Sequence, residues 1–67
     1  MKRRFIIVNV VYINGTIKKI IPIDSIASIE QEDDRTIIYY IENNLSKKVF
    51  VMESLDTLIN NADVIEL

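Results

Sequence analysis

The sequence predicts a mainly β (α+β) fold, in which a small antiparallel sheet or curled barrel of four to five strands precedes one short C-terminal helix. Two runs of β-branched and aromatic residues, at 4–13 and 36–42, have the composition of strands. An Asn-Gly pair follows the first run and is the strongest short-range hairpin signal. The hydrophobic period changes only after Ser54. No linker or repeat interrupts the chain, so we expect a single domain over residues 1–67.

The first expected strand, residues 4–13, is apolar on both faces and is interrupted only by Asn9. A strand of this kind is covered on both sides. In so short a protein the cover comes from curling of the sheet, from a helix or from a partner subunit. The sequence leaves these three alternatives open.

The first reversal is expected at Asn14 and Gly15. Both residues tolerate positive φ, so we predict a type I′ turn whose structural residues are Asn14 and Gly15. The return strand spans residues 16–23 and contains Pro22. Because proline has no amide donor, the end of this strand should lie at a sheet edge or leave the ladder.

The middle of the chain is expected to supply the remaining strands. Residues 25–30 suit either a helical turn or a short strand, because the segment is too short for its periodicity to decide. The acidic residues 30–35 are expected to form a turn. Residues 36–42 then form a strand with two apolar faces, and after the reversal at 43–46 residues 47–53 form the next strand.

A short amphipathic helix is expected to begin after Ser54, which is a suitable N-cap. Asp56 lies near the positive end of the helix dipole. The apolar stripe recurs at i, i+3, i+4 and i+7, namely at Leu55, Leu58, Ile59 and Ala62. The tail from residue 63 can pack back on the sheet or extend along a partner.

The apolar content exceeds what a small monomer can easily bury. Of the 67 residues, 49% are hydrophobic and 14 are isoleucine. A domain of this size buries only about 60% of the surface that its unfolded chain exposes. The chain has no cysteine and no histidine, so neither a disulfide nor a common zinc site can add stability. We therefore expect a homo-oligomer whose subunit contacts cover part of the apolar surface.

The charge of the chain argues against a large nucleic-acid surface. The net charge is −2 and the pI is about 4.9, whereas a domain pI above about 9 is typical of such surfaces. No apolar run reaches the roughly 18 residues of a membrane-spanning helix, and the start of the chain lacks the cleavage site of a signal peptide. We therefore expect a cytoplasmic protein with no membrane contact.

The residue types argue against an enzyme. The sequence has no histidine general base, no cysteine nucleophile and no glycine-rich phosphate loop. The acidic cluster of Glu30, Glu32, Asp33 and Asp34 lacks the spaced pattern of a calcium loop. We therefore assign no catalytic, cofactor-binding or metal-binding residue.

Surface binding is the function class that remains. Six tyrosines and lysines are the interaction candidates: Lys18, Lys19, Tyr39, Tyr40, Lys47 and Lys48. Adjacent strand residues point to opposite faces, so at most one of Tyr39 and Tyr40 serves the core of a monomer. The first hypothesis is a module that binds an unidentified protein partner through an exposed edge or an apolar face. The alternative is a nucleotide-binding or RNA-binding module that uses inter-subunit surfaces, since aromatic rings stack on bases and lysines contact phosphates.

Three stretches, "VVYING", "IIPIDSIASIEQEDDRTIIYY" and "VFVMESLDTLI", form one longer pattern. On these stretches the chain resembles the FlbD-like family of small flagellar and swarming motility proteins. The resemblance implies a small regulatory or interaction module of a bacterium or phage, without catalytic residues. The matching positions are Ile13, Asn14, Gly15, Asp24, Ile26, Ile29, Glu30, Asp34, Ile37, Val51, Glu53 and Ser54.

Overall fold

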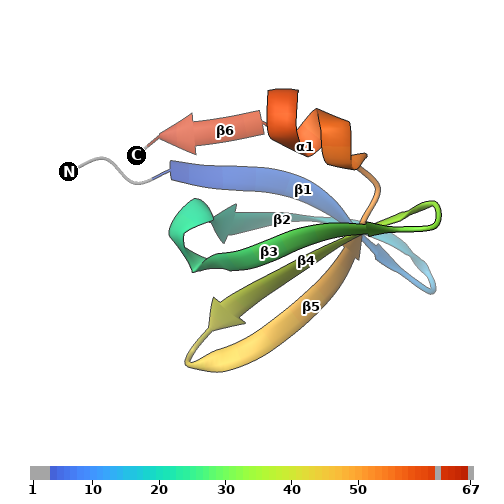
Figure 1. Ribbon diagram of the computed structural model, residues 1–67. Helices are drawn as coiled ribbons and strands as arrows, with labels where there is room; N and C mark the ends of the chain where they lie inside the picture. The colour runs from blue at the N-terminus through green and yellow to red at the C-terminus, as the bar shows by residue number, and fades with distance from the viewer. Residues whose placement is uncertain (1–3, 62, 67) are drawn as a thin grey trace.

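One curled antiparallel sheet carries a short helix at its C-terminal end. The computed structural model describes residues 4–61 and 63–66, with side chains for residues 4–59. In Figure 1 the strands converge at the end where the β1–β2 and β3–β4 hairpins turn, and they splay apart at the other end. Along the chain the elements are β1 (Arg4–Tyr12), β2 (Gly15–Pro22), the 3₁₀ helix η1 (Ile23–Ser25), β3 (Ile26–Glu32), β4 (Arg35–Glu42), β5 (Leu45–Val51), α1 (Leu55–Asn61) and β6 (Asp63–Glu66).

The sheet has a continuous path of five strands in the order β2-β1-β5-β4-β3, and β6 pairs with β1 beside this path. One side of β1 pairs with β2. The other side is shared, because residues 4–7 pair with β6 and Val10 pairs with Val51 of β5. The predicted mainly β fold with one C-terminal helix is confirmed, and the tail adds a strand by packing back on the sheet.

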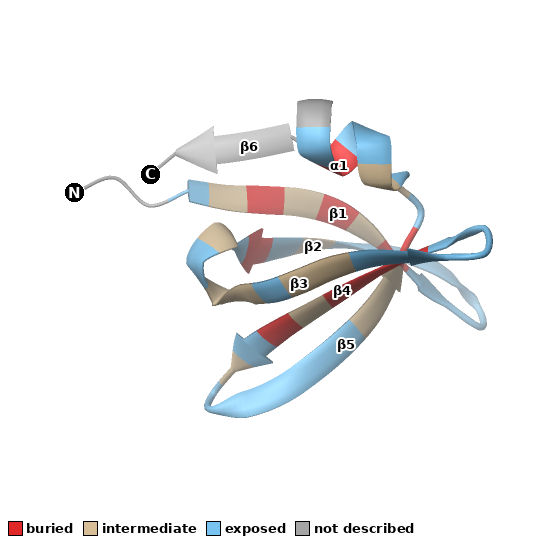
Figure 2. Cartoon of the chain, in the orientation of Figure 1, coloured by how far each residue is buried: buried red, intermediate tan, exposed pale blue. Residues whose placement is uncertain are grey.

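The core lies on one face of the curled sheet, which we call the inner face; the opposite side is the outer face. Figure 2 shows buried and less buried residues alternating along β1, as the two-residue period of a strand requires. On the outer face of β4, Ile37 is also buried. The buried cluster of the inner face consists of Ile6, Val8, Val10, Ile21, Ile38, Tyr40, Val51 and Leu58. Since Leu58 belongs to α1, the helix covers part of this core.

The β1–β2 hairpin turns one residue earlier than the sequence predicted. Tyr12 pairs with Gly15, so Ile13 and Asn14 form the loop and Gly15 begins β2. Gly15 has a φ of 136°, whereas Asn14 does not have a positive φ. The predicted type I′ turn at Asn14 and Gly15 is therefore wrong, because that turn needs positive φ at both central residues and this register places a β-branched isoleucine at the first.

The type I′ geometry occurs instead in the β4–β5 hairpin. Glu42 pairs with Leu45, so Asn43 and Asn44 are the two loop residues. Their φ angles are 52° and 64°, which is the pattern of a type I′ turn. Asparagine tolerates this left-handed region better than most residues. The reversal predicted at 43–46 therefore needs only the two loop residues Asn43 and Asn44.

Replacing Gly15 by valine is expected to lower the free energy of unfolding by about 1–2 kcal/mol, because a β-branched residue rarely adopts a positive φ. A Cβ atom at Gly15 would meet no atom within 4 Å, so the cost is conformational and not steric. Urea unfolding followed by circular dichroism measures the difference. The exposed neighbour Thr16 supplies the control, and Thr16→Val should change stability little. Equal stability of the Gly15→Val variant and the wild type would contradict the assigned strain.

Residues 25–30, for which the sequence left a helical turn or a short strand open, are strand except for Ser25, the last residue of η1. The helical turn η1 comes first and β3 follows. The Ser25 hydroxyl donates a hydrogen bond to the Pro22 carbonyl at 2.8 Å and closes the turn. The acidic turn is shorter than predicted, because Glu32 pairs with Arg35 and leaves a loop of only two residues. Residues 30–32 are thus strand residues, whose backbone is paired with β4.

Helix α1 begins after Ser54, as predicted. The Thr57 amide donates to the Ser54 hydroxyl oxygen at 3.1 Å, which confirms Ser54 as the N-cap. Leu58 is buried, whereas Ile59 is largely exposed. Strand β5 ends at Val51, two residues before the predicted end of that strand. Ala62 lies outside the described residues.

A hydrogen-bonded contact between Asn9 and Glu53 explains the polar position in the first strand. The Asn9 amide donates to Glu53 Oε1 at 3.0 Å and to Oε2 at 3.2 Å, and Asn9 Nδ2 donates to Oε2 at 2.7 Å. The Met52 amide donates to the Asn9 carbonyl at 2.9 Å. Asn9 lies between the part of β1 that pairs with β6 and the residue that pairs with β5. The Glu53 carboxylate therefore replaces a strand partner where neither strand pairs with β1.

Candidate functional site

The six interaction candidates do not form one site, because they lie on two faces of the sheet. Directly paired strand residues share a face, and the register pairs Asn9 with Lys18, Tyr39 with Lys48 and Tyr40 with Lys47. The structure therefore separates them into two groups. Lys18, Tyr39 and Lys48 belong to the outer face, and Lys19, Tyr40 and Lys47 belong to the inner face.

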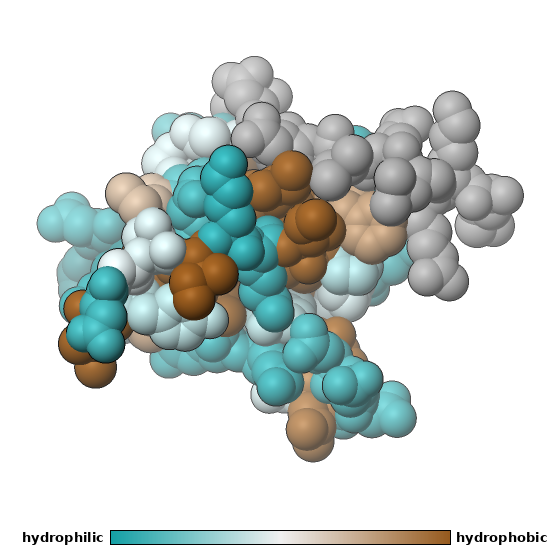
Figure 3. All heavy atoms as spheres, turned by 180° about the vertical axis from the view of Figure 1, so that it is seen from behind, coloured by the Kyte–Doolittle hydropathy of each residue, from teal (hydrophilic) through white to brown (hydrophobic). Residues whose placement is uncertain are grey.

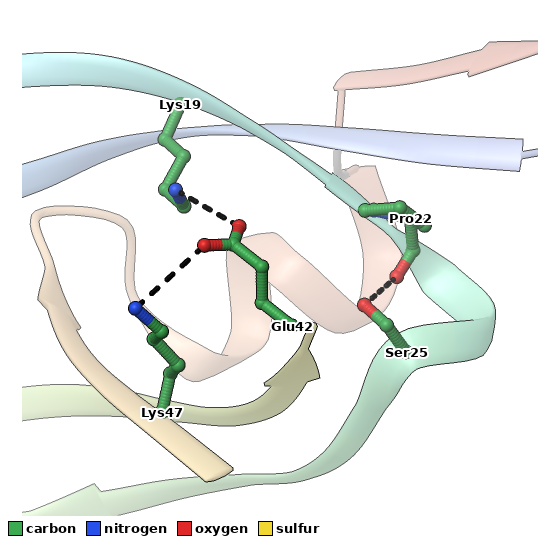
Figure 4. Close-up of polar contacts among 5 residues, drawn as sticks. All are labelled: Lys19, Pro22, Ser25, Glu42 and Lys47. Atoms are coloured by element: carbon green, nitrogen blue, oxygen red, sulfur yellow. Dashed lines mark hydrogen bonds and ion pairs between the residues drawn. The ribbon is translucent and has the colours of Figure 1, made fainter. Parts of the chain in front are cut away.

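The inner-face lysines form ion pairs with Glu42. Lys19 Nζ lies 3.6 Å from Glu42 Oε2, and Lys47 Nζ lies 3.8 Å from Oε1, as Figure 4 shows. Lys19 Nζ also lies 5.6 Å from the centre of the Tyr40 ring. Burial alone would lower the pKa of Lys19, but the interactions with Tyr40 and Glu42 outweigh it and raise that pKa. Lys19 therefore stays charged, and its contacts are with groups of its own chain.

Tyr40 is a core residue, and its burial leaves almost none of its surface for contact with a partner. Its exposed fraction is 4%, and it belongs to the buried cluster of the inner face. The sequence required that at most one of the two tyrosines serve the core. The structure assigns that role to Tyr40, and it leaves Tyr39 half-buried on the outer face.

The outer face of β4 and β5 carries two aromatic rings beneath cationic side chains. Lys48 Nζ lies 6.0 Å from the centre of the Tyr39 ring and 5.3 Å from that of Phe50. The Arg35 guanidinium carbon lies 5.4 Å from the centre of the Phe50 ring. These distances are typical of cation–π contacts. Lys48 and Arg35 of the same chain thus already contact these partly buried rings.

A hollow of about 340 Å³ adjoins the Phe50 ring, and its chemistry does not favour phosphate. Three of its lining side chains are acidic, and they come from the end of β3 and the β3–β4 loop. Negative charge close to Arg35 and Lys48 weakens the attraction that a phosphate would feel. The lining consists of Glu32, Asp33, Asp34, Arg35, Ile37, Lys48 and Phe50. Among the residues that the structure describes, no three acidic side chains are placed so that they could hold a metal ion together.

A larger, more apolar groove lies where the two hairpins converge, and we call it the tip groove. It encloses about 560 Å³. Figure 3 shows hydrophobic side chains at the surface of this end of the molecule, which lies to the left in that view. The lining residues come from the tip of the β1–β2 hairpin, the β3–β4 hairpin and the end of β5, namely Val11, Tyr12, Ile13, Asp34, Arg35, Phe50, Val51 and Met52.

Four exposed apolar side chains gather in the tip groove. Ile13 is fully exposed, and Met52 has an exposed fraction of 66%. Val11 and Tyr12 are also exposed and line the same groove. Large apolar side chains gathered on a surface in this way typically mark a binding site.

The interaction candidates predicted from the sequence did not include the residues of the tip groove. In the sequence, Ile13 is the last residue of one expected strand and Met52 lies within another. The sequence therefore predicts sheet positions for both residues. One signal could have found Ile13: an isoleucine at a tight turn cannot be covered by the strands that the turn connects. Met52 could be recognised only once β5 was known to end at Val51.

Comparisons with protein-family models, with curated proteins and with solved structures find no match to this chain. In the described part of the chain, no helix has the length and apolar character needed to cross a membrane.

Proposed function

We propose that this chain is a non-enzymatic, self-associating interaction module that binds an apolar segment of a partner protein in the tip groove. The observation that carries the proposal is the complete exposure of Ile13 beside Tyr12 and Met52 in one groove. Leaving three such side chains in water is unfavourable. When a partner covers these side chains, their apolar surface is removed from water, and this stabilises the complex.

The lining of the tip groove suits a peptide segment. Its volume of about 560 Å³ lies in the range of ligand-binding clefts. Met52 supplies a flexible thioether that adapts to differently shaped apolar side chains. Asp34 and Arg35 line the same groove and offer an acceptor and donors for the backbone of a bound peptide.

The FlbD-like resemblance extends the proposal to a regulatory role in flagellar or swarming motility, in the cytoplasm of a bacterium. Two of the positions that carry the resemblance, Glu53 and Ser54, hold the connection between β5 and α1. Gly15, the one glycine of the sequence, begins β2 and has a positive φ. These positions serve the fold, so the resemblance supports the type of module, and the groove supports what it binds.

A displayed library of random peptides tests this function. We expect the wild type to retain peptides with aromatic or aliphatic side chains and the Ile13→Asp variant to lose them, with at least a tenfold drop in affinity. The control is Ile59→Asp, the same substitution at another exposed isoleucine, which lies on α1 outside the groove. Peptides lost equally from both variants, or no peptides retained by the wild type, would contradict the proposal.

The alternative function is nucleotide or RNA binding, and the rings of Tyr39 and Phe50 beneath Lys48 favour it. Short RNAs run beside the peptide library separate the two functions. Retention of RNA that falls steeply with salt and is lost in the Lys48→Ala variant would replace the peptide-binding proposal. We expect no such retention, because of the net charge of −2 and the acidic lining of the hollow beside the Phe50 ring.

A further inference from the structure

We propose that copies of this chain join head to tail through the two edges of their sheets, with β2 of one copy pairing beside β3 of the next. This inference rests on the self-association in the proposed function. It uses a surface that differs from the tip groove, so the two proposals can fail separately.

Both edges of the sheet are open and similar in length. The strand path begins with β2 and ends with β3, and neither has a second strand partner in the described sheet. The two strands contain eight and seven residues, and most residues of each are exposed. An open edge presents a row of unpaired amides and carbonyls, which another strand can satisfy.

Strand β2 also carries exposed apolar side chains that a neighbouring strand would cover. Ile17 and Ile20 are both more than half exposed on this edge strand. Natural edges are usually blunted by charges, prolines or bulges. Pro22 does this at the last residue of β2, and Lys18 and Lys19 do it at the middle, so a strand that pairs with β2 must supply negative charge.

The two edges carry opposite charges on the same face of the sheet. Lys18 lies at the middle of β2, on the outer face, because it pairs with Asn9. Glu30 lies on β3, also on the outer face, because it pairs with Ile37. When β2 of one copy lies beside β3 of the next, opposite charges share one face, and such cross-strand pairs stabilise a sheet.

The same charges disfavour a symmetric contact between two β2 strands. Lys18 and Lys19 are the central residues of β2, which spans Gly15–Pro22. An antiparallel pair in full overlap would therefore place lysines directly opposite lysines, which destabilises a sheet. A contact between unlike edges repeats from copy to copy, so it closes into a ring or continues as an open assembly.

Charge reversal at the two edges tests this inference. We expect light scattering to give a multimeric mass for the wild type, and the mass to fall toward that of one chain in Lys18→Glu and in Glu30→Lys. The double variant Lys18→Glu/Glu30→Lys should recover the multimer. An equimolar mixture of the two single variants should recover it too, because each supplies the edge that complements the other. A wild type that is monomeric at all concentrations would overturn the inference.

Two controls keep the outcome decisive. Asp56→Lys makes the same charge change as Glu30→Lys on the exposed surface of α1, and we expect it to keep the multimer. Lys18 and Glu30 are exposed, so circular dichroism should show all variants folded. If the single variants keep the wild-type mass, or the double variant fails to recover it, the edges do not join the copies. Ile13→Asp should keep the multimer while it loses peptides, which separates this inference from the proposed function.

Discussion

The Ile38→Ala variant is expected to lose about 2–5 kcal/mol of its free energy of unfolding, the usual cost of truncating a fully buried isoleucine. Ile38 has an exposed fraction of 0% and belongs to the buried cluster of the inner face. The truncation leaves a cavity that the sheet can fill only in part. A domain of this size has a total stability of roughly 3–10 kcal/mol. The variant should therefore be close to unfolding at room temperature.

Ile41 supplies the matched control for this prediction. It lies on the same strand, β4, but has an exposed fraction of 45%. We expect Ile41→Ala to change the free energy of unfolding by less than about 1 kcal/mol. Urea unfolding followed by circular dichroism measures both variants at one protein concentration, because self-association makes stability depend on concentration. Similar losses in the two variants would contradict the assignment of the core to the inner face.

Glu53→Ala is expected to lower the free energy of unfolding by about 2–4 kcal/mol, because it removes the charged carboxylate that accepts three hydrogen bonds. Those contacts join Glu53 to the amide and the side chain of Asn9, at distances of 2.7 to 3.2 Å. No strand replaces the carboxylate there, since β5 and β6 pair with β1 on either side of Asn9. The partly buried Asn9 amide therefore loses its acceptor, and an unsatisfied amide is costly.

Glu42→Ala separates this effect from the loss of any carboxylate. The Glu42 carboxylate contacts Lys19 and Lys47, but these contacts are ion pairs between partly exposed side chains. Such pairs contribute only about 0–1 kcal/mol. Glu53→Gln should fall between wild type and Glu53→Ala, because the amide retains one acceptor oxygen. If Glu53→Ala costs no more than Glu42→Ala, the carboxylate does not replace a strand partner.

The local features of this fold were predictable from the sequence. Runs of β-branched and aromatic residues predicted β1 and β4, because these side chains pack on a pleated surface. Ser54 predicted the start of α1, because its hydroxyl can accept the first free amide of a helix. These patterns depend on residues close together in the chain, so they can be recognised without knowledge of the tertiary structure.

The features that depend on distant residues were not predictable. Asn9 and Glu53 are 44 positions apart, and nothing local in either segment indicates their contact. The register of the β1–β2 hairpin is likewise a property of the whole sheet, and it moved the turn to Ile13 and Asn14. For the same reason the sequence could not decide which of the tyrosines in β4 enters the core.

Of the candidate surfaces, the edge residue Lys18 was predicted from the sequence and the tip groove was not. Lys18 was predicted as an interaction residue, and its pairing with Asn9 gives it a place on the outer face at an open edge. The tip groove was missed, because it combines residues from three separate hairpin or strand ends. A groove of this kind exists only once the curl of the sheet brings those ends together.

Light scattering of the wild type across a concentration series tests the central claim, that exposed apolar surface and complementary edges make this chain self-associate. We predict a mass that is a multiple of 7.8 kDa, the mass of one chain, and that persists on dilution to micromolar concentrations. It should decrease at high salt, because salt screens the exposed charges of the two edges. A mass of 7.8 kDa at every concentration would contradict the account.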